Sequence, residues 1–392
     1  MTSRNLKKVL LLVTICILLV GFVSATETNK TTVKNHKVVK ETAKTVSKSI
    51  KEPDNIVTNT KSIAKKNNEK NLVTQTKKSS TSKTFSVSTF KTLNSALTNT
   101  KYDTVTINIK SNIKLKDNQV MTNSIKKLTI NGNGNTISGA KKYKFLVTKN
   151  TATIKNLKII NCYSSRGGAI QNEGTLTISN CTLNYNKAEN SGAINNDGTL
   201  TIKNSKIGYN KASEEGGAIS NVGIALKIIN SEIYNNIANG FGGAITNGEK
   251  LTIKSSTLKN NEGYNGGAIR NDGTLVINDS VLKNNKATDT GGAIAQYESK
   301  LTIYKSKLNS NKAKTGGAIW NVGKTTINYS TLNKNKATKN GGAVYSEKSR
   351  FMNNFTTMTI KNSKLLSNSP NGKKTVVNKG GKFSMDKKTL IK

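Results

Sequence analysis

One phrase recurs at a nearly constant interval through most of the chain. Gly-Gly-Ala-Ile, or a close variant, occurs eight times from Gly167 onward, and its alanine returns every 24 to 26 residues. The eight alanines are Ala169, Ala193, Ala218, Ala244, Ala268, Ala293, Ala318 and Ala343. A period this constant is typical of units that each stack on their neighbours, so the spacing predicts a solenoid.

Each repeat unit carries three short apolar segments. In the first unit they are Ala169-Ile170, Leu176-Thr-Ile178 and Leu183. Segments of three or four residues are too short for a helix, so we expect three short strands joined by turns. A leucine-rich repeat has a similar period, but it would add a helix or extended convex segment and more leucines to every unit. The pattern favours an all-β fold, a parallel β-helix of about 25 residues per coil.

Two columns of polar residues recur in phase with the apolar segments. The first column is Asn172, Asn196, Asn221, Asn247, Asn271, Gln296 and Asn321, and the second is Asn186, Asn210, Asn236, Asn261, Asn285, Asn311, Asn335 and Asn368. An amide both donates and accepts hydrogen bonds, so stacked amides about 4.8 Å apart are expected to form ladders. Glycines two residues after a column Asn, such as Gly174 and Gly198, are expected to adopt a positive φ at a sharp corner.

The N-terminal segments have compositions unlike the repeats. Arg4, Lys7 and Lys8 precede an apolar run over residues 9–23, and small residues follow at Ser24 and Ala25, so residues 1–25 are predicted to be a cleaved secretory signal. An uncleaved anchor is the alternative. Residues 26–83 are rich in Lys and Thr and lack aromatic residues, which predicts a disordered linker. We therefore expect a secreted, extracellular or cell-surface protein.

The ordered part is expected to begin near residue 84. Ser88 is placed to cap a short helix that carries Phe90, Leu93 and Leu97 on one face. Including degenerate coils from residue 105 onward, we expect roughly eleven coils up to residue 368 and assign residues 84–369 to the β-helix with its N-terminal cap. The last repeat is longer, so about eight residues around 350–355 should bulge out. Residues 370–392 are expected to be a C-terminal cap or tail.

The repeat resembles two known groups of proteins. Gly-Gly-Ala-Ile, then Asn-x-Gly-Thr-Leu-Thr-Ile, then a hydrophobe-x-x-Asn, is similar to the repeats of chlamydial polymorphic outer-membrane proteins and of adhesin-like proteins of methanogenic archaea, over roughly residues 105–368. The chain departs from the chlamydial pattern, which has Phe where Leu183 and Ile207 stand here, and its C-terminal residues are not expected to form that family's barrel. The resemblance implies a right-handed parallel β-helix, a surface location and a role in adhesion or the cell envelope.

The sequence shows no clear cluster of candidate catalytic residues. Glycosidases and lyases on this scaffold need converging carboxylates or calcium ligands. The acids are scattered, the best in-phase pair is Glu173 and Asp197, and the single histidine, His36, lies in the linker. We expect no catalytic residue, no metal and no cofactor. The alternative is a carbohydrate-active enzyme, either a polysaccharide lyase or a glycosidase, on the same fold.

Binding has a clearer candidate surface. The residue after each Ala-Ile is expected to point outward because side chains alternate along a strand, and this column contains Arg270, Trp320 and Tyr345. Tyr185 and Tyr209 share another phase, one coil apart. These five residues are the predicted ligand surface. The alternative is that the aromatic rings only stabilise the sheet by cross-strand packing.

The charge of the chain indicates diffuse attraction more than specific recognition. Lys and Arg number 62 against 21 Asp and Glu, and only four of the cations are Arg. Specific nucleic-acid binding is therefore not expected. The expected partners are anionic cell-envelope polymers, surface glycans or partner-cell proteins. Cys162 and Cys181 lie at different phases of the repeat, so we favour unpaired thiols over a disulfide.

Overall fold

The computed structural model describes residues 81–349, 356–370 and 374–392. Residues 75–392 form one compact unit. The predicted signal peptide, nearly all of the predicted linker and the centre of the bulge predicted near residues 350–355 lie outside the described residues.

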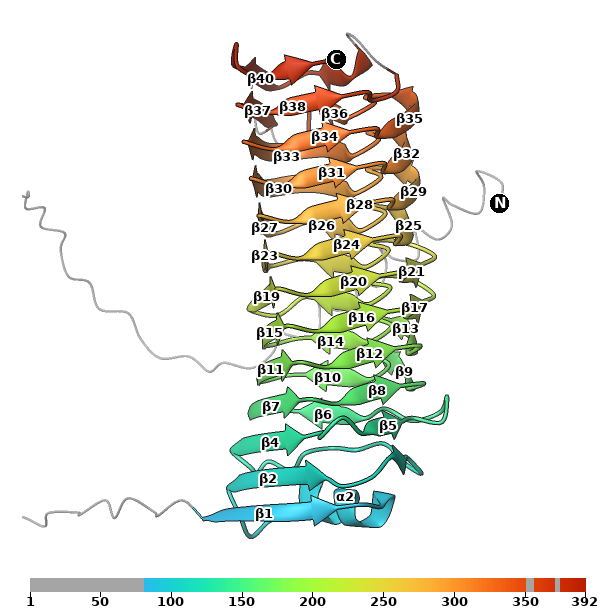
Figure 1. Ribbon diagram of the computed structural model, residues 1–392, viewed down its shortest axis with the longest axis vertical. Coiled ribbons are helices and arrows are strands. Elements are labelled where there is room, and N and C mark those ends of the chain that lie inside the picture. The colour runs from blue at the N-terminus through green and yellow to red at the C-terminus, as the bar shows by residue number, and fades with distance from the viewer. Residues whose placement is uncertain (1–80, 350–355, 371–373) are drawn as a thin grey trace, which may run out of the picture. The chain divides into compact units, whose positions relative to one another are not determined.

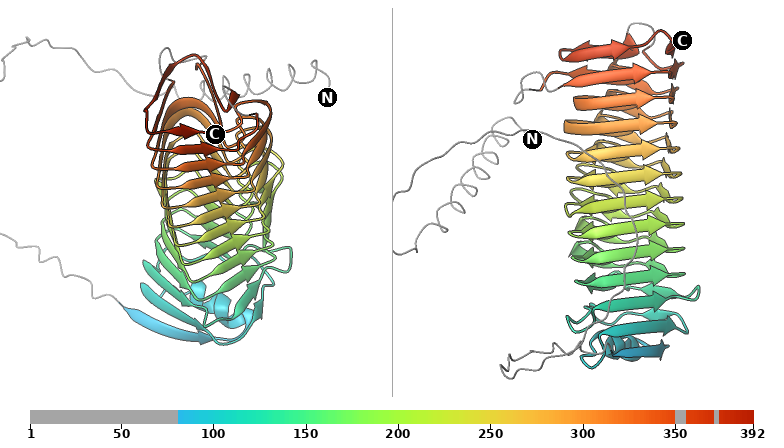
Figure 2. Two further views of the ribbon diagram at one scale, coloured as in Figure 1. Left: turned by 45° about the horizontal axis from the view of Figure 1, so that its top comes forward. Right: turned by 90° about the vertical axis from the view of Figure 1, so that its left-hand side faces the viewer.

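The stack is a parallel β-helix of about 13 coils with about 24 residues each, as the repeat predicts. Consecutive coils pair in parallel and in register, for example Ile170 with Ile194 and Leu176 with Leu200. Figure 1 shows the coils following one another from the N-terminal to the C-terminal end, and Figure 2 shows the same stack from two further directions. Residues 104–366 supply the eleven coils expected, while strand β1 (Ser82–Val87) and residues 374–392 add one at each end.

Each full coil holds four strands, one more than expected. The first strand of the coil ends at the first polar column. This first row is β6 (Leu146–Thr148), β10 (Ile170–Asn172), β14 (Ile194–Asn196), β18 (Ile219–Asn221), β22 (Ile245–Asn247), β26 (Ile269–Asn271), the start of β30 (Ile294–Tyr304), the start of β33 (Ile319–Asn328), β36 (Val344–Glu347) and β39 (Val376–Lys379).

The second strand carries two inward apolar residues, such as Leu176 and Ile178. This row is β1, β2 (Thr104–Ile109), β4 (Lys127–Asn131), β7 (Thr151–Lys155), β11 (Thr175–Ser179), β15 (Thr199–Lys203), β19 (Ala225–Ile229), β23 (Lys250–Lys254), β27 (Thr274–Asn278), the ends of β30 and β33, β37 (Thr357–Lys361) and β40 (Lys382–Met385). Strands β30 and β33 run through the corner between the two rows, which joins both rows into one sheet.

The third strand carries a single inward hydrophobe, such as Leu183. This row is β3 (Ile113–Lys114), β5 (Thr136–Ser138), β8 (Lys158–Ile160), β12 (Thr182–Asn184), β16 (Lys206–Gly208), β20 (Glu232–Tyr234), β24 (Thr257–Lys259), β28 (Val281–Lys283), β31 (Lys307–Asn309), β34 (Thr331–Asn333), β38 (Lys364–Leu366) and β41 (Leu390–Ile391).

The fourth strand is the one that sequence reasoning missed. Its inward residue is usually an alanine, such as Ala188 or Ala287, and one small residue between mostly polar neighbours is a weak strand signal. This row is β9 (Tyr163–Arg166), β13 (Lys187–Asn190), β17 (Lys211–Ala212), β21 (Ile237–Ala238), β25 (Glu262–Asn265), β29 (Lys286–Thr290), β32 (Lys312–Thr315) and β35 (Lys336–Asn340).

A short helix lies at the N-terminal end of the stack, as predicted. Helix α2 (Phe90–Leu97) buries Leu93 and Leu97. Its N-cap is Thr89, not Ser88, because the Thr89 hydroxyl accepts from the Thr92 backbone N–H at 3.2 Å in a capping box.

Both predicted amide columns form ladders of hydrogen bonds. In the second column the side-chain amide of each Asn donates to the side-chain oxygen of the next, at 3.0 Å from Asn186 to Asn210 and 2.9 Å from Asn335 to Asn368. The same side-chain oxygen also accepts a hydrogen bond from the backbone N–H of the donor residue. All members of this column are buried. The first column connects Asn172 to Gln296 through side-chain amides alone, at 2.6 to 2.7 Å. The ladder ends there, one residue short of the prediction, because Gln296 donates to Ser299 and Asn321 donates to Ser346.

A third ladder was not anticipated from the sequence. A column of buried serines occupies the corner between the second and third strands, and each backbone N–H donates to the hydroxyl of the next serine at 3.1 Å. Its members are Ser205, Ser231, Ser256, Ser280, Ser306, Ser330 and Ser363. Hydroxyl groups therefore satisfy the backbone at this corner, as the amides do at the next one.

The two cysteines stand at the N-terminal ends of these columns. The backbone N–H of Cys162 donates to the side-chain oxygen of Asn186, and that of Cys181 donates to the hydroxyl of Ser205. Both thiols are buried and unpaired. The expectation of two unpaired cysteines in different phases is therefore confirmed.

The glycines have different roles from those expected. Gly174 and Gly198 do not have a positive φ; a Cβ at Gly198 would instead overlap the carbonyl oxygen of Gly174 in the preceding coil. Positive φ belongs to the first glycine of the repeat phrase, for example 61° at Gly167. The corner glycines thus allow close approach of coils, and the phrase glycines allow the sharp turn.

The coil before the last contains the predicted insertion. Asn321 and Lys324 of β33 pair with Ser346 and Thr357, so three residues in one coil match eleven in the next. The eight extra residues lie between the paired parts of β36 and β37.

Replacement of Asn261 by Ala should destabilise the stack. The change removes an oxygen that accepts from Asn236 and an amide that donates to Ile233 and Asn285, leaving buried groups unpaired. We expect a loss of about 2–5 kcal/mol in the free energy of unfolding. Urea unfolding followed by circular dichroism measures it. Asn333→Ala, on the partly exposed outer face of β34, is the matched control, and equal effects from both variants would contradict a structural role for the ladder.

The buried thiols should make stability depend on pH in the alkaline range. Burial raises the pKa of Cys162 to about 12 and that of Cys181 to about 11, from an ordinary value of 9.0. The unfolded chain loses these protons first, so the free energy of unfolding should fall above about pH 9, by at most about 1.4 kcal/mol per pH unit for each thiol. In the native state at pH 8 neither thiol should react with a thiol reagent, whereas both should react in urea; rapid native labelling would contradict the burial.

Candidate functional site

The column that follows each Ala-Ile faces away from the core but is less exposed than expected. Asn195, Ser220, Thr246 and Ala295 are buried. The turn that ends the fourth strand folds over this column; for example, the Thr246 hydroxyl donates to the carbonyl of Phe241 at 3.2 Å. The column therefore forms the floor of a groove instead of an open face.

Two hollows lie along this groove. The upper hollow, nearer the C-terminal end of the stack, has a volume of about 810 Å³. The lower hollow, nearer the N-terminal end, has a volume of about 710 Å³. The upper hollow is lined by Asn265, Arg270, Asp272, Asp289, Thr290, Tyr297, Glu298, Thr315, Trp320, Val322, Tyr345, Glu347 and Lys348. The lower hollow is lined by Arg166, Asn190, Asn195, Ser213, Glu214, Glu215, Ser220, Val222, Asn239, Gly240 and Phe241. Both volumes lie in the range of ligand-binding pockets.

Aromatic side chains form one part of the upper hollow. Trp320 and Tyr345 are register partners on β33 and β36, and the ring of Tyr297 lies 4.6 Å from that of Trp320 at an angle of 53°. Trp320 packs against Ala295 and Val322 and is only 9% exposed. Its indole N–H donates to no group among the described residues, so it is available to a ligand acceptor.

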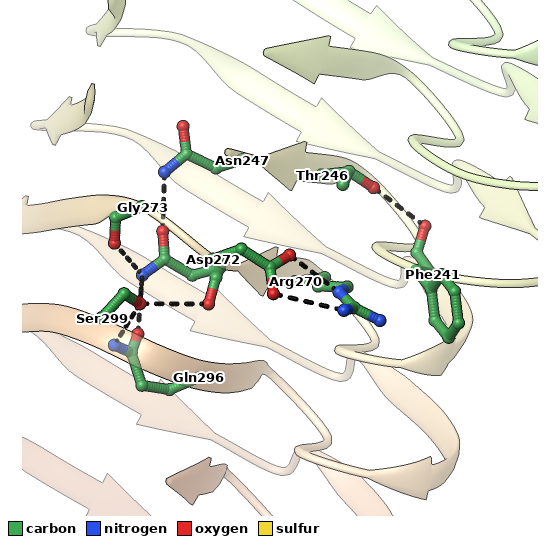
Figure 3. A network of polar contacts seen from close by, with 9 residues as sticks. Phe241, Thr246, Asn247, Arg270, Asp272, Gly273, Gln296 and Ser299 are labelled. Carbon is green, nitrogen blue, oxygen red and sulfur yellow. Dashed lines mark hydrogen bonds and ion pairs between the residues drawn. The ribbon is translucent and has the colours of Figure 1, made fainter. Parts of the chain in front are cut away.

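Arg270 separates the two hollows. Its guanidinium carbon lies 4.2 Å from the ring centroids of both Phe241 and Tyr297, and Nε and Nη2 bond the two carboxylate oxygens of Asp272 at 2.8 and 3.2 Å (Figure 3). Burial lowers the pKa of Arg270, but the hydrogen bond and charge of Asp272 outweigh it and raise the pKa overall. The guanidinium is thus a fixed cation held by two rings and a carboxylate.

The remaining charged groups of the upper hollow are mostly acidic. Asp289 is 3.9 Å from the ammonium of Lys314, and the carboxylate of Glu298 accepts a hydrogen bond from the Ser349 hydroxyl. Within the described residues, neither Glu298 nor Glu347 has a Lys or Arg partner at ion-pair distance. Burial and then the carboxylate of Glu347 raise the pKa of Tyr345, while burial raises that of Tyr297.

Glu298 owes its position to an irregularity of β30. Gln296 and Lys300 pair with Asn271 and Thr274, so this corner has one residue more than its neighbour in the preceding coil. The register shifts again against β33, and Glu298 has φ 39°, a conformation uncommon for a residue other than Gly. A bulge of this kind re-aims side chains beside a site.

The lower hollow is also acidic. Glu214 and Glu215 line it with Arg166, and Glu214 accepts from the Asn190 amide at 3.0 Å. Burial raises the pKa of Glu215, opposed by the charge of Arg270. The two hollows thus share the electrostatic influence of one arginine.

The structure divides the five predicted ligand residues into two groups. Arg270, Trp320 and Tyr345 line the upper hollow together. Tyr185 and Tyr209 lie in neither hollow; they occupy the corner after the third strand, 53% and 44% exposed, with rings stacked at 5.0 Å. Tyr209 also meets Tyr234 edge-on at 5.3 Å.

Several groove residues were missed by sequence reasoning. Tyr297 and Glu298 fall in the bulge, where the only signal was one extra residue between Gln296 and Lys300. The predicted acid pair is on the same face of the stack, but Glu173 accepts from Gln171 at 2.8 Å and Asp197 from Asn195 at 2.7 Å. The described residues contain no group of three or more His, Cys, Asp and Glu placed to hold a metal ion.

Comparisons with known proteins agree with the fold. Residues 84–216, about a third of the chain, match the model of the pectate lyase-like adhesive domain. Residues 329–347 match the Chlamydia polymorphic membrane protein repeat. No curated protein and no solved structure matches the chain. The two matches support an adhesin-like role at a cell surface; in the part of the chain that the structure describes, no helix is both long and apolar enough to cross a bilayer.

Substitution of Arg270 by Lys should loosen the wall between the hollows. Lys keeps the charge but loses the bidentate bond to Asp272 and the stacking on two rings, so we expect a loss of about 1–2 kcal/mol in stability. Arg166→Lys is the matched control, because the Arg166 side chain is 57% exposed and lies 3.7 Å from Asp197, against 22% exposure for Arg270. Thermal unfolding of both variants measures the difference, and similar melting temperatures would contradict the role given to Arg270.

Proposed function

We propose that this protein is a secreted or cell-surface adhesin-like protein that acts without catalysis and binds a glycan chain in its groove. The observation that carries the proposal is the upper hollow, where Trp320, Tyr345 and Tyr297 lie together with a free indole N–H. Aromatic faces stack on sugar rings and provide much contact area for few rotors, while polar groups beside them bind hydroxyls. The direction of the groove along several coils suits an extended polymer.

The lysines on the outer faces of the strands, here called the lysine coat, have a second role in this proposal. Lys286, Lys312 and Lys336 are in register on consecutive coils of the fourth row, and further lysines lie beside them. Such rows attract anionic cell-envelope polymers diffusely and with strong dependence on salt. The coat would thus concentrate the protein at an envelope or a partner cell, and the groove would select the glycan.

Alanine substitutions in the groove test the proposal. Binding of the full chain to a glycan array and to whole cells should weaken about tenfold in Trp320→Ala and in Tyr345→Ala. Tyr185→Ala, at an exposed aromatic residue outside both hollows, is the matched control. Circular dichroism confirms folding of each variant. Unchanged binding by both groove variants, at low and at high salt, would leave only the lysine coat as the binding surface.

The second candidate, a carbohydrate-active enzyme, is favoured by the carboxylates that face the same hollow. A glycosidase needs two carboxylates on either side of the scissile bond. Incubation of the full chain with each glycan that it binds should leave the chain length of that glycan unchanged. Depolymerisation that is abolished by Glu298→Gln or Glu347→Gln would replace the non-catalytic proposal with the enzyme.

A further inference from the structure

The groove carries the opposite charge balance to the rest of the protein. Six carboxylates and three cationic side chains line the two hollows, whereas the whole chain has 62 Lys and Arg against 21 Asp and Glu. Lysines are frequent on the outer faces of the strands. Among the described residues that line the two hollows, however, Lys348 is the single lysine. An anionic polymer attracted by the lysines of the β-helix would therefore be repelled by the carboxylates inside the groove.

Four of these six carboxylates, Glu298 and Glu347 in the upper hollow and Glu214 and Glu215 in the lower one, have no Lys or Arg at ion-pair distance within the described residues. Of the other two, Asp272 is bound to Arg270 and Asp289 lies near Lys314. Glu298 additionally sits in a bulge with a positive φ. A locally strained backbone that presents an acidic side chain beside a hollow is typical of a functional position.

Arg270 shows how this face holds a cation. Its guanidinium lies between two rings and against one carboxylate. Further along the groove, Trp320 and Tyr345 with Glu298 and Glu347 offer the same two components, aromatic faces and carboxylates, around the open volume of the upper hollow. A protonated amine is the ligand group that satisfies both.

From these observations we infer that the upper hollow selects a glycan bearing free amino groups, that is, a hexosamine polymer with unacetylated amines. The inference rests on the proposed glycan-binding function and adds the class of sugar. The sugar ring packs on Trp320 and its hydroxyls accept from the indole N–H, while the ammonium lies between Glu298 and Glu347. Acidic sugars such as uronates are excluded from the hollow by the same carboxylates.

The test compares three oligosaccharides of equal length, namely glucosamine, N-acetylglucosamine and galacturonate oligomers, by calorimetric titration into the full chain. The glucosamine oligomer should bind about tenfold more tightly than the acetylated one, and Glu298→Gln with Glu347→Gln should remove about that factor. Binding of the acetylated oligomer should not change in these variants. Glu189→Gln, at an exposed carboxylate that lines neither hollow, is the matched control.

The outcomes separate this inference from the proposed function. Equal binding of the amino and acetylated oligomers, or tighter binding of galacturonate, with Trp320→Ala still weakening it, overturns the amine and leaves glycan binding intact. Absence of binding by all three oligomers and by a wider glycan array overturns both. Concentration-dependent self-association of the chain that is lost in Glu298→Gln with Glu347→Gln would assign the cation to lysines of a second copy and also overturn the sugar amine.

Discussion

The structure depends on hydrogen bonding between identical polar side chains of successive coils. A coil of about 24 residues turns four corners, and each corner leaves backbone groups that no strand can satisfy. The amides of the Asn186 column bind both the backbone and the next amide, and the serines of the Ser205 column satisfy the corner before it. Because every member needs its neighbours in register, the ladders hold the coils at strand spacing and prevent slippage.

The groove is a consequence of the same geometry. The first residue of each repeat phrase, a glycine except at Ser191, adopts a positive φ, which folds the end of the fourth strand over the outward column of the first strand. Where that column holds Asn195, Ser220 or Thr246 the side chain is covered, and where it holds Arg270 or Trp320 the larger side chain forms walls and floor. The repeat thus covers most of this column, and the larger side chains at a few positions line the two hollows.

The charges of the molecule are divided between surfaces. Lysines on the outer faces of the strands give these faces a positive charge, and the field of such a charge acts over a distance that salt shortens. The groove has rings, carboxylates and one clamped arginine, which act over short distances and need a fitted ligand. Under the proposed function, attraction to an envelope and selection of a glycan would fall to different parts of the same coil.

The sequence by itself determined the fold, the number of coils between residues 104 and 366 and both amide ladders, because period and phase are local properties that stacking only repeats. It also picked out Arg270, Trp320 and Tyr345, since they share one phase of the repeat. Only the tertiary structure decided that these residues line a hollow, because the covering turn and the bulge at Glu298 depend on how one coil meets the next. For the same reason it separated Tyr185 and Tyr209 from the groove and brought together carboxylates that are scattered along the chain.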